Sequence, residues 1–391
     1  MVIADEVRGA DRQRRPKNRR DSILTVASTL FHRSGYAGTS LDDIASAVGI
    51  TAPALYRHFR NKDELYVAAL ELNLRQLETA VSGAADVTDA VRRLAGVGVE
   101  FSTVGMLWNS DRRRRLADPE GALDHRAVAA TAALASLLET SAEPALAALL
   151  SRSVLAAVSS TGYYQSALSA DRARAELERT ISIVVSFRPA EATVTIRVGS
   201  EEATKRSWET RRSALLDAGA ALLLRQGGYN AVTIEQIAAE VGVTPATAYA
   251  EFPSKAALFA AVFQRAANWF SSMVQQSAAG ASSADDALDR AVRAYLPLIT
   301  EHPSWIGPTL DELMNLPPEY LEPALATTET YLDEWLAICA AVAPDDDREA
   351  VRVRMRAALA VLDDRVVAGS TQRVLTVDDS ATLVARIIRV S

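Results

Sequence analysis

The chain has 391 residues, of which 49% are hydrophobic and 23% charged, and its formal net charge is −7. This length exceeds what a single hydrophobic core holds, so we expect two domains, and the composition is that of a soluble globular protein rich in helix-forming residues. We find neither a secretory signal nor an apolar run long enough to cross a bilayer, and the single cysteine, Cys339, excludes an intrachain disulfide and fits a reducing cytoplasm.

A basic segment opens the chain. From Arg12 to Arg60 nine Arg and Lys residues stand against three Asp residues, an excess of six positive charges on an acidic protein. Binding to phosphates requires a local basic face rather than a basic total. We predict that the arm RQRRPKNRR, which ends in Arg19 and Arg20, contacts a nucleic-acid backbone or minor groove, and a solvated tail is the alternative.

A long helix and a short helix are expected after the arm. Apolar residues from Ile23 to Phe31 recur at i, i+3, i+4, i+7 and i+8, which is one face of a helix, and Gly35 is expected to end it. Ser40 can cap the next helix, with Asp43 in the reciprocal place of a capping box. The buried side of this short helix is predicted to consist of Ile44, Ala45 and Val48.

A third helix is expected after a tight turn at Gly49. Thr51 is its predicted N-cap, and a proline in its first turn costs little because the missing N–H has no helical partner there. Leu55 and Phe59 are predicted to face inward. The residues left outward or at the rim are Ala52, Pro53, Ala54, Tyr56, Arg57 and His58.

Two short helices joined by a glycine-bearing turn form a helix-turn-helix, whose second helix enters the major groove of DNA. Small residues at the start of this recognition helix allow its backbone to approach base edges closely. A fourth helix is expected after Asn61, and Lys62 at its N-terminus can reach a phosphate, as can Tyr56 and His58. The segment therefore predicts a DNA-binding domain over residues 21–68, preceded by an arm over 1–20.

The same pattern recurs without a gap 193 residues later. The segment GYAGTSLDDIASAVGITAPALYRHFRNKDELY, from Gly35, aligns with GYNAVTIEQIAAEVGVTPATAYAEFPSKAALF, from Gly228, and 11 of the 32 positions are identical. Such a density of identities marks a duplicated unit, and a duplication decides the whole architecture. Thr233 with Gln236 repeats the capping box, and Gly242 repeats the turn.

Each copy therefore supplies a set of candidate DNA-binding residues. In the first copy these are Arg19, Arg20, Ser40, Thr51, Ala52, Pro53, Ala54, Tyr56, Arg57, His58 and Lys62. In the second copy they are Arg212, Thr233, Thr244, Pro245, Ala246, Thr247, Tyr249 and Lys255.

The first motif resembles the DNA-binding segment of the TetR family of transcriptional regulators. The match runs from Arg19 to about Leu70 and includes TSLDDIASAVGITAPALYRHFRNKDELY, and a weaker match runs from Arg212 to about Phe263. The resemblance implies base contacts by Ala52, Pro53, Ala54 and Arg57, and phosphate contacts by Thr51, Tyr56, His58 and Lys62. It also implies a double-stranded DNA operator as partner. The duplicated architecture is similar to the tandem TetR regulators found among repressors of mce-type lipid-import operons, which suggests a small apolar or lipid-like effector.

The second copy keeps the frame of the motif but loses its charge. The basic residues Arg57, His58 and Arg60 correspond to Ala250, Glu251 and Pro253. From Lys205 to Pro253 five basic residues meet five acidic ones. A carboxylate at Glu251 is unfavourable beside a phosphate, although it could accept from a cytosine amino group. Two interpretations stay open: either the second motif reads a different half-site, or it serves only as an internal dimerisation partner.

The remaining segments fit helical effector-binding and dimerisation domains. We place these domains at 69–186 and 263–391, with a linker at 187–205 that includes a short extended piece and a second helix-turn-helix domain at 206–262. Apolar and aromatic side chains are typical of small-molecule pockets and are otherwise ordinary core. The pocket candidates are Met106, Trp108, Tyr163, Trp305, Met314 and Trp335.

Four segments late in the two copies carry apolar residues at helical spacing. They are Glu143–Val158 and Arg172–Val185 in the first copy, and Asp346–Val367 and Ser380–Val390 in the second. A four-helix bundle made from them would bury both faces within one molecule. We therefore predict an all-α fold of two TetR-like units, packed as an intramolecular pseudo-dimer that binds an asymmetric operator.

No catalytic constellation accompanies these motifs. We find no glycine-rich phosphate loop, no GxSxG elbow and no histidine pair with metal-ligand spacing. The sequence therefore predicts a ligand-responsive repressor that is not an enzyme and needs neither metal nor cofactor. The alternative is an effector-binding or interaction protein in which only the first motif binds DNA.

Overall fold

The computed structural model of the chain describes residues 19–100, 122–163, 166–190, 193–197, 210–226, 228–306, 312–313, 315–365 and 371–389. Within these ranges side chains are left undescribed at 32–37, 122–127, 163, 197, 305–306 and 371–372. The described residues are mostly α-helical, with one two-stranded sheet among them. The prediction of an all-α fold is confirmed.

The first copy consists of a three-helix N-terminal domain and a helical body. Its elements are α2 (Arg19–Gly38), α3 (Leu41–Val48), α4 (Ala52–Tyr56), α5 (Lys62–Ser82), α6 (Val87–Glu100), α8 (Ala122–Leu138), α9 (Pro144–Ser159), the short 3-10 helix η1 (Ser160–Tyr163) and α10 (Ala170–Ser186). Strand β1 (Val194–Arg197) follows, inside the segment expected to be the linker.

The second copy repeats this order. Its elements are α11 (Arg211–Gln226), η2 (Tyr229–Ala231), α12 (Ile234–Val241), α13 (Pro245–Glu251), α14 (Lys255–Ala279), α15 (Ala284–Glu301), α16 (Pro303–Ile306), α18 (Pro318–Val342), α19 (Arg348–Asp363), β2 (Thr371–Val374) and α20 (Val377–Arg389).

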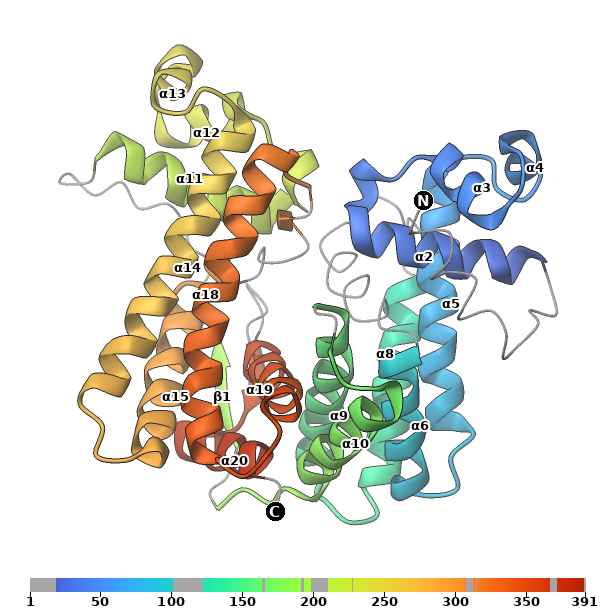
Figure 1. Ribbon diagram of the computed structural model, residues 1–391, viewed down its shortest axis with the longest axis vertical. Helices are drawn as coiled ribbons and strands as arrows, with labels where there is room; N and C mark the ends of the chain where they lie inside the picture. Colours follow the sequence, from blue (N-terminus) through green and yellow to red (C-terminus); the bar gives the residue numbers. More distant parts are fainter. Residues whose placement is uncertain are drawn as a thin grey trace.

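The two copies stand side by side, with their N-terminal domains at the same end of the molecule (Figure 1). In this view α3 and α4 lie at the top of one side, and α12 and α13 at the top of the other. The long helices α5 and α14 run from these domains down into the two bodies. The two short helices that match the predicted recognition helices therefore lie at one end of the molecule, and the contact between the copies lies toward the other.

The contact between the copies is built from the four predicted helical segments. α19 packs against both α9 and α10, and α20 packs against α10. Each helix contributes fully buried apolar side chains, among them Val154, Ile181, Val351 and Ile387. The helices expected from the apolar spacing are thus observed within a few residues of their predicted bounds, and they meet across the two copies.

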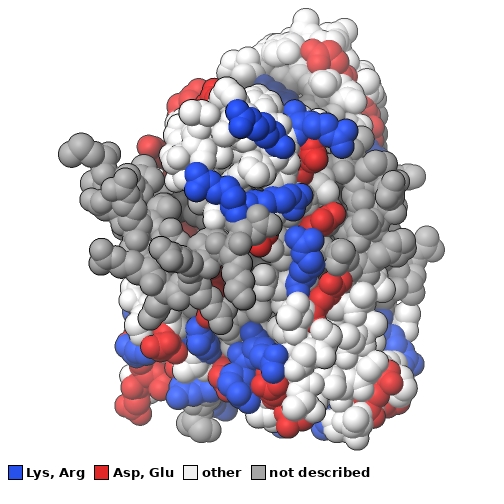
Figure 2. All heavy atoms as spheres, turned by 90° about the vertical axis from the view of Figure 1, so that its right-hand side faces the viewer, with Lys and Arg blue, Asp and Glu red and all other residues white. Residues whose placement is uncertain are grey.

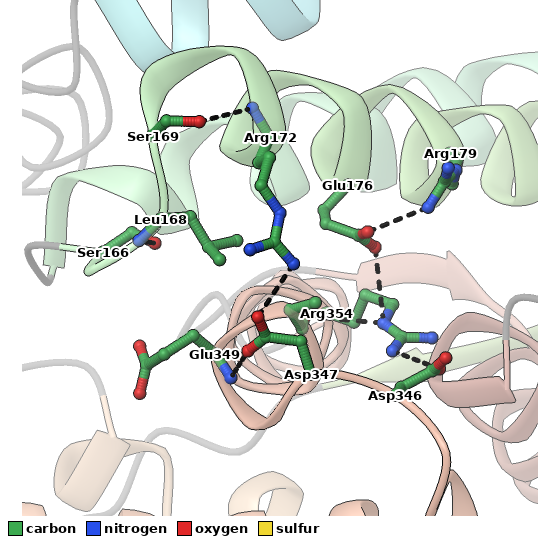
Figure 3. A network of polar contacts seen from close by, with 11 residues as sticks. Ser166, Leu168, Ser169, Arg172, Glu176, Arg179, Asp346, Asp347, Glu349 and Arg354 are labelled. Atoms are coloured by element: carbon green, nitrogen blue, oxygen red, sulfur yellow. Dashed lines mark hydrogen bonds and ion pairs between the residues drawn. The ribbon is translucent and has the colours of Figure 1, made fainter.

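Charged side chains add a polar seam to this apolar contact (Figure 3). Arg354 on α19 is only 2% exposed, and it pairs with Asp346 at 2.6 Å and with Glu176 of the first copy at 3.6 Å. Its Nη1 also donates to the Ile388 carbonyl at 2.6 Å. Removing one partner of a buried ion pair leaves an uncompensated charge. The ion pair between Arg354 and Glu176 therefore favours the packing of the two copies against each other.

The linker is also attached to the second body. β1 pairs antiparallel with β2, so that Val194 lies opposite Val374 and Arg197 opposite Thr371. Just before the strand, the Ala190 N–H donates to the Asp379 carboxylate at 2.8 Å. These contacts fasten the connecting segment to the α19–α20 region of the second copy.

Two expectations were wrong. Gly35 does not end the first helix, because α2 continues to Gly38, and only its counterpart Gly228 adopts the left-handed region, with φ +107°. Glycine permits that conformation but does not require it.

In addition, residues 144–162 are long and apolar enough to cross a membrane by length and composition. In this fold 72% of that window is buried, and α9 packs against α8, α10 and α19 as a core helix.

Candidate nucleic-acid interface

The first motif is held by a capping box and a left-handed glycine, as predicted. Asp43 N–H donates to Ser40 Oγ at 3.0 Å, and Ser40 N–H donates to Asp43 Oδ2 at 2.9 Å. The hydrogen bonds from Ser40, and then the positive charge of Lys62, lower the pKa of the Asp43 carboxyl. Gly49 closes α3 with φ 73°, a conformation that costs glycine little. These local bonds fix the angle between α3 and α4.

α4 buries one side and exposes the other. Leu55 and Phe59 are 0% and 1% exposed, which confirms that they face inward. Tyr56 is 53% exposed although it is a large aromatic residue. The predicted contact residues of this helix lie outward or at its rim: Thr51, Ala52, Pro53, Ala54, Tyr56, Arg57 and His58. Thr51 takes the N-cap position without making a side-chain cap bond.

Basic side chains surround this surface. Arg19 at the start of α2 is exposed, while the Arg20 guanidinium lies over the Phe59 ring, 4.9 Å from its centroid. The side chain of Arg60 is 91% exposed. Figure 2 looks onto the first copy and shows several Lys and Arg side chains in the upper part of the molecule, with some Asp and Glu among and above them. Of the basic residues counted in the sequence, the structure describes the side chains of Arg19, Arg20, Arg57 and Arg60, and the arm residues 12–18 lie outside the described residues.

Lys62 is the first residue of α5, as predicted, and it lies close enough to Asp43 to act on that carboxyl. Asn61 caps the helix through Glu64 N–H at 2.8 Å, and the Glu64 carboxylate accepts from Arg60 N–H at 2.7 Å. The side chains of Asn61 and Glu64 therefore both stabilise the N-terminus of α5. A phosphate contact by Lys62 stays a prediction.

The second motif has the same frame. Thr233 and Gln236 form the predicted capping box, and Gly242 ends α12 with φ 75°, close to the 73° of Gly49. Thr244 caps α13 with its side chain, which accepts from Thr247 N–H at 3.2 Å. Ala248 and Phe252 are buried, at 0% and 2% exposed. The duplicated residues therefore maintain the same backbone geometry in both copies.

The exposed face of α13 differs from that of α4. It carries no Arg, Lys or His, and its outward residues are Thr244, Pro245, Ala246, Tyr249 and Ala250, with Thr247 at the rim. Tyr249 is 47% exposed, and its hydroxyl lies 3.4 Å from the Glu235 carboxylate. The charge that distinguishes the two motifs in the sequence thus distinguishes their outward surfaces.

Two predicted DNA-binding cations of the second copy are turned toward their own domain. Arg212 donates to the Glu251 carbonyl at 2.9 Å and stacks on the Phe252 ring at 4.2 Å. Lys255 Nζ donates to the Tyr229 and Val232 carbonyls at 3.0 and 3.1 Å. Burial lowers the pKa of Lys255, and the negative charge of Glu312 partly opposes this effect. Both side chains therefore hold the domain together, and their expected DNA contacts remain predictions.

Each copy places an arginine on the aromatic ring that follows its recognition helix, but from a different register. In the first copy Arg20 covers Phe59, whereas in the second Arg212, the counterpart of Arg19, covers Phe252. The neighbouring arginine is exposed in both cases, as Arg19 and as Arg211. Both copies therefore place an arginine on this ring, but the two arginines differ by one position in the sequence alignment of the copies.

Sequence reasoning missed Glu312, which links the second body to the second motif. This residue is 1% exposed, and its carboxylate accepts from Tyr229 N–H at 2.6 Å. A Cβ atom added at Gly228 would overlap the Glu312 carboxylate. Since Glu312 lies 83 positions from Tyr229, no local pattern could have signalled the contact.

Of the six pocket candidates, Trp335 is the one whose side chain is described. Trp335 is 1% exposed and packs edge-on against Tyr295 in the second body, with ring centroids 5.7 Å apart. Met106, Trp108 and Met314 lie outside the described residues, and the side chains of Tyr163 and Trp305 are not described. Among the described residues, no group of His, Cys, Asp and Glu side chains could hold a metal ion.

Comparison with known families identifies both motifs. The family model described as "Bacterial regulatory proteins, tetR family" matches this chain twice, at residues 23–69 and 215–262. The two ranges contain the helix-turn-helix elements α3–α4 and α12–α13 together with parts of the helices on either side.

Several curated proteins are similar to parts of the chain. "HTH-type transcriptional activator FasR" of Mycolicibacterium smegmatis is 37% identical over 82 residues, which cover 21% of this chain and 37% of the relative. "Biofilm operon icaADBC HTH-type negative transcriptional regulator IcaR" of Staphylococcus epidermidis is 46% identical over 52 residues, which cover 13% and 28%. The chain therefore spans little more than a third of one relative and less of the other.

Solved structures are similar at the level of one copy. A TetR-family transcriptional regulator from Bordetella parapertussis aligns with a TM-score of 0.41 and 18% identity, over 46% of this chain and 95% of its own. A TetR-like transcriptional regulator from Rhodococcus aligns with a TM-score of 0.39 and 19% identity, over 47% and 96%.

Proposed function

The chain is a TetR-family protein with two DNA-binding domains in tandem, and from this premise we propose that it is a sequence-specific DNA-binding transcriptional regulator that acts as a repressor. The observation that carries the proposal is the surface of α4. This surface exposes Tyr56, Arg57 and His58 beside the basic start of α2. Arginine reads guanine in the major groove through two hydrogen bonds, and aromatic and basic side chains hold the phosphates around it.

The two motifs act together as an intramolecular pseudo-dimer. Single-copy regulators with a helix-turn-helix present two recognition helices by pairing two chains. Here α9 and α10 pair with α19 and α20 inside one chain, and both short recognition helices lie at the same end of the molecule (Figure 1). Since α4 and α13 expose different residues, the two half-sites differ in sequence. We therefore propose that one chain binds one asymmetric operator.

Binding of a small apolar or lipid-like effector releases the operator. The supporting observation is the contact of Glu312 with Tyr229, because it joins the second body directly to the turn that precedes α12. A ligand that displaces the segment around Glu312 would change the position of the second motif, and a ligand shifts an equilibrium only through such a difference in affinity. We place this regulator in the cytoplasm and assign it no enzymatic activity.

A second candidate function has one observation in its favour. Arg212 and Lys255 are occupied within the second domain, so this motif offers few cations to phosphates. In that case only the first motif binds DNA, and the second copy serves as a dimerisation partner and effector-binding body. The two candidates differ in the length of DNA that one molecule protects.

Footprinting of the purified chain on the DNA upstream of its own coding sequence tests both candidates. The pseudo-dimer should protect two half-sites one helical turn apart, with different sequences. Tyr56→Ala should weaken protection of both, because the strong motif anchors the complex. Tyr249→Ala should weaken protection of one half-site only. Protection of a single half-site, unaffected by Tyr249→Ala, would support the second candidate. A duplex bound no better than random DNA would contradict both.

A further inference from the structure

The outward face of α13 carries methyl groups beside the exposed Thr244 and Tyr249. Ala246 and Ala250 are exposed and stand one helical turn apart, opposite the buried Ala248. Pro245 extends this face at the start of the helix, and Thr247, whose side chain includes a γ-methyl group, is half-buried at its rim. Since the residues that begin a recognition helix contact base edges, this methyl surface is what the second motif presents to the major groove.

The composition of α13 excludes most of the direct readout of bases. Guanine is read by two hydrogen bonds from Arg or Lys, and adenine by two from Asn or Gln. The helix, PATAYAE, contains none of these residues. Its one carboxylate belongs to Glu251, the last residue of the helix. The backbone carbonyl of Glu251 accepts a hydrogen bond from Arg212. Guanine and adenine therefore have no side chain on this helix to bind them in the usual way.

The polar groups that remain are engaged with each other. The hydroxyl groups of Thr244 and Thr247 lie 2.8 Å apart, and the Tyr249 hydroxyl lies 3.4 Å from Glu235. Beside the Tyr249 ring, the remaining apolar groups on the exposed face are small side chains that carry methyl groups. In the major groove the feature that such a surface recognises is the C5-methyl group of thymine.

We propose that the second motif reads a thymine-containing half-site through contacts between methyl groups, made by Ala246, Ala250 and the γ-methyl group of Thr247. The inference rests on the proposed binding of DNA by this motif and specifies its target. The first motif differs at one decisive position, because Arg57 stands where the second has Ala250. The operator then carries a guanine in the half-site under α4 and thymines in the half-site under α13.

Replacing thymine by deoxyuridine tests this directly, since uracil pairs with adenine identically and lacks only the C5-methyl group. The operator is first obtained by selecting bound duplexes from a random-sequence library with the full-length chain. Each contacted thymine replaced under α13 should weaken binding roughly fourfold, from roughly 0.8 kcal/mol per buried CH₂ group. The same replacement at thymines outside the two half-sites, which neither recognition helix contacts, should change affinity by less than twofold.

Thr247→Ser supplies the matched protein variant, because it removes the γ-methyl group and retains the hydroxyl that bonds Thr244. The loss caused by this variant and the loss caused by uracil at the contacted position should not add, as expected for two halves of one contact. Additive losses, or equal affinity for the thymine and uracil duplexes with both half-sites protected, would overturn the inference alone. Selection of duplexes with no preference under α13 would overturn both the inference and the DNA role of the second motif.

Discussion

The two helix-turn-helix motifs of this chain share a backbone frame and differ in the face that they present. Capping boxes at Ser40 and Thr233 and left-handed glycines at Gly49 and Gly242 hold both in the same geometry. Outside this frame, α4 exposes Arg57 where α13 exposes Ala250. The residues that set the angle of a recognition helix can therefore stay the same while the residues on its exposed face change. A duplicated motif can therefore preserve its fold while its specificity changes.

The largest expected effect separates the two motifs by affinity. Tyr56→Ala combined with Arg57→Ala removes one proposed phosphate contact and one proposed base contact, so we expect operator binding to weaken about 100-fold from roughly 1–3 kcal/mol for each strong contact. Tyr249→Ala in the second motif should weaken it about tenfold or less, from ~1 kcal/mol for one hydrogen-bonding side chain. Fluorescence anisotropy with a labelled operator at fixed salt measures both. Equal losses would erase the proposed division between a strong and a weak motif.

The comparison extends to the helical bodies, where Asp363 ends α19 and Ser159 ends α9. Burial raises the pKa of Asp363 to about 7, although the hydrogen bond from Tyr295 opposes this. The folded state thus holds a proton that the unfolded state releases near the ordinary aspartate pKa of 3.8. The contribution of Asp363 to the free energy of unfolding is therefore fully present at low pH and is lost as the pH rises through about 7, by at most ~1.4 kcal/mol per pH unit.

Urea unfolding between pH 4.5 and 7.5 tests this dependence. Asp363→Asn should flatten the change of unfolding free energy with pH, because the amide cannot ionise. Ser159→Asn is the matched change in the first body and should leave the pH dependence of the wild type in place. A wild-type slope that persists in Asp363→Asn would show that another group titrates.

A glycine pair gives a smaller effect of opposite sign in the two copies. Gly228→Ala should destabilise the second domain by roughly 1–3 kcal/mol, because it forces an L-residue to φ +107° and places a Cβ against Glu312. Gly35→Ala occupies the equivalent position inside helix α2, where alanine should be neutral or stabilising by up to ~1 kcal/mol. Thermal unfolding of the two variants compares them. Two destabilised variants would contradict the difference in backbone between the copies.

The smallest expected effect is a transfer of specificity. Ala250→Arg gives the second motif the counterpart of Arg57, which we propose reads guanine, so one base pair under the second motif should acquire a preference for guanine of about tenfold, or ~1.4 kcal/mol. Arg57→Ala should relax the preference at one base pair under the first motif. Selection from a random library reads out both, and an unchanged consensus in both variants would remove Arg57 from the base-reading set.

The sequence predicted the parts of the fold that depend on neighbouring residues. Capping boxes, turn glycines and the inward positions of Leu55 and Phe59 follow from bonds over three or four residues or from helical periodicity, and the structure confirms them. The four pairing helices were predictable because their apolar spacing is regular. The failure at Gly35 is of another kind, since a glycine allows several conformations and its tertiary surroundings select one.

Contacts over long sequence distances could not be predicted. Glu312 reaches Tyr229 over 83 positions, and Arg354 pairs with Glu176 of the other copy. A single charged residue on a helix carries no mark of its partner. Arg212 and Lys255 illustrate the same limit at the interface, because the sequence shows the cation but not whether it faces DNA or its own domain.

The central claim is that one chain with two unlike motifs replaces the two chains of an ordinary dimer. Native mass spectrometry of the purified protein on its selected operator tests it most directly. We expect the smallest specific complex to contain one chain of 42.0 kDa and one duplex with two half-sites of different sequence. A smallest complex of two chains on a palindromic duplex, with only the first motif of each chain protecting DNA, would contradict it.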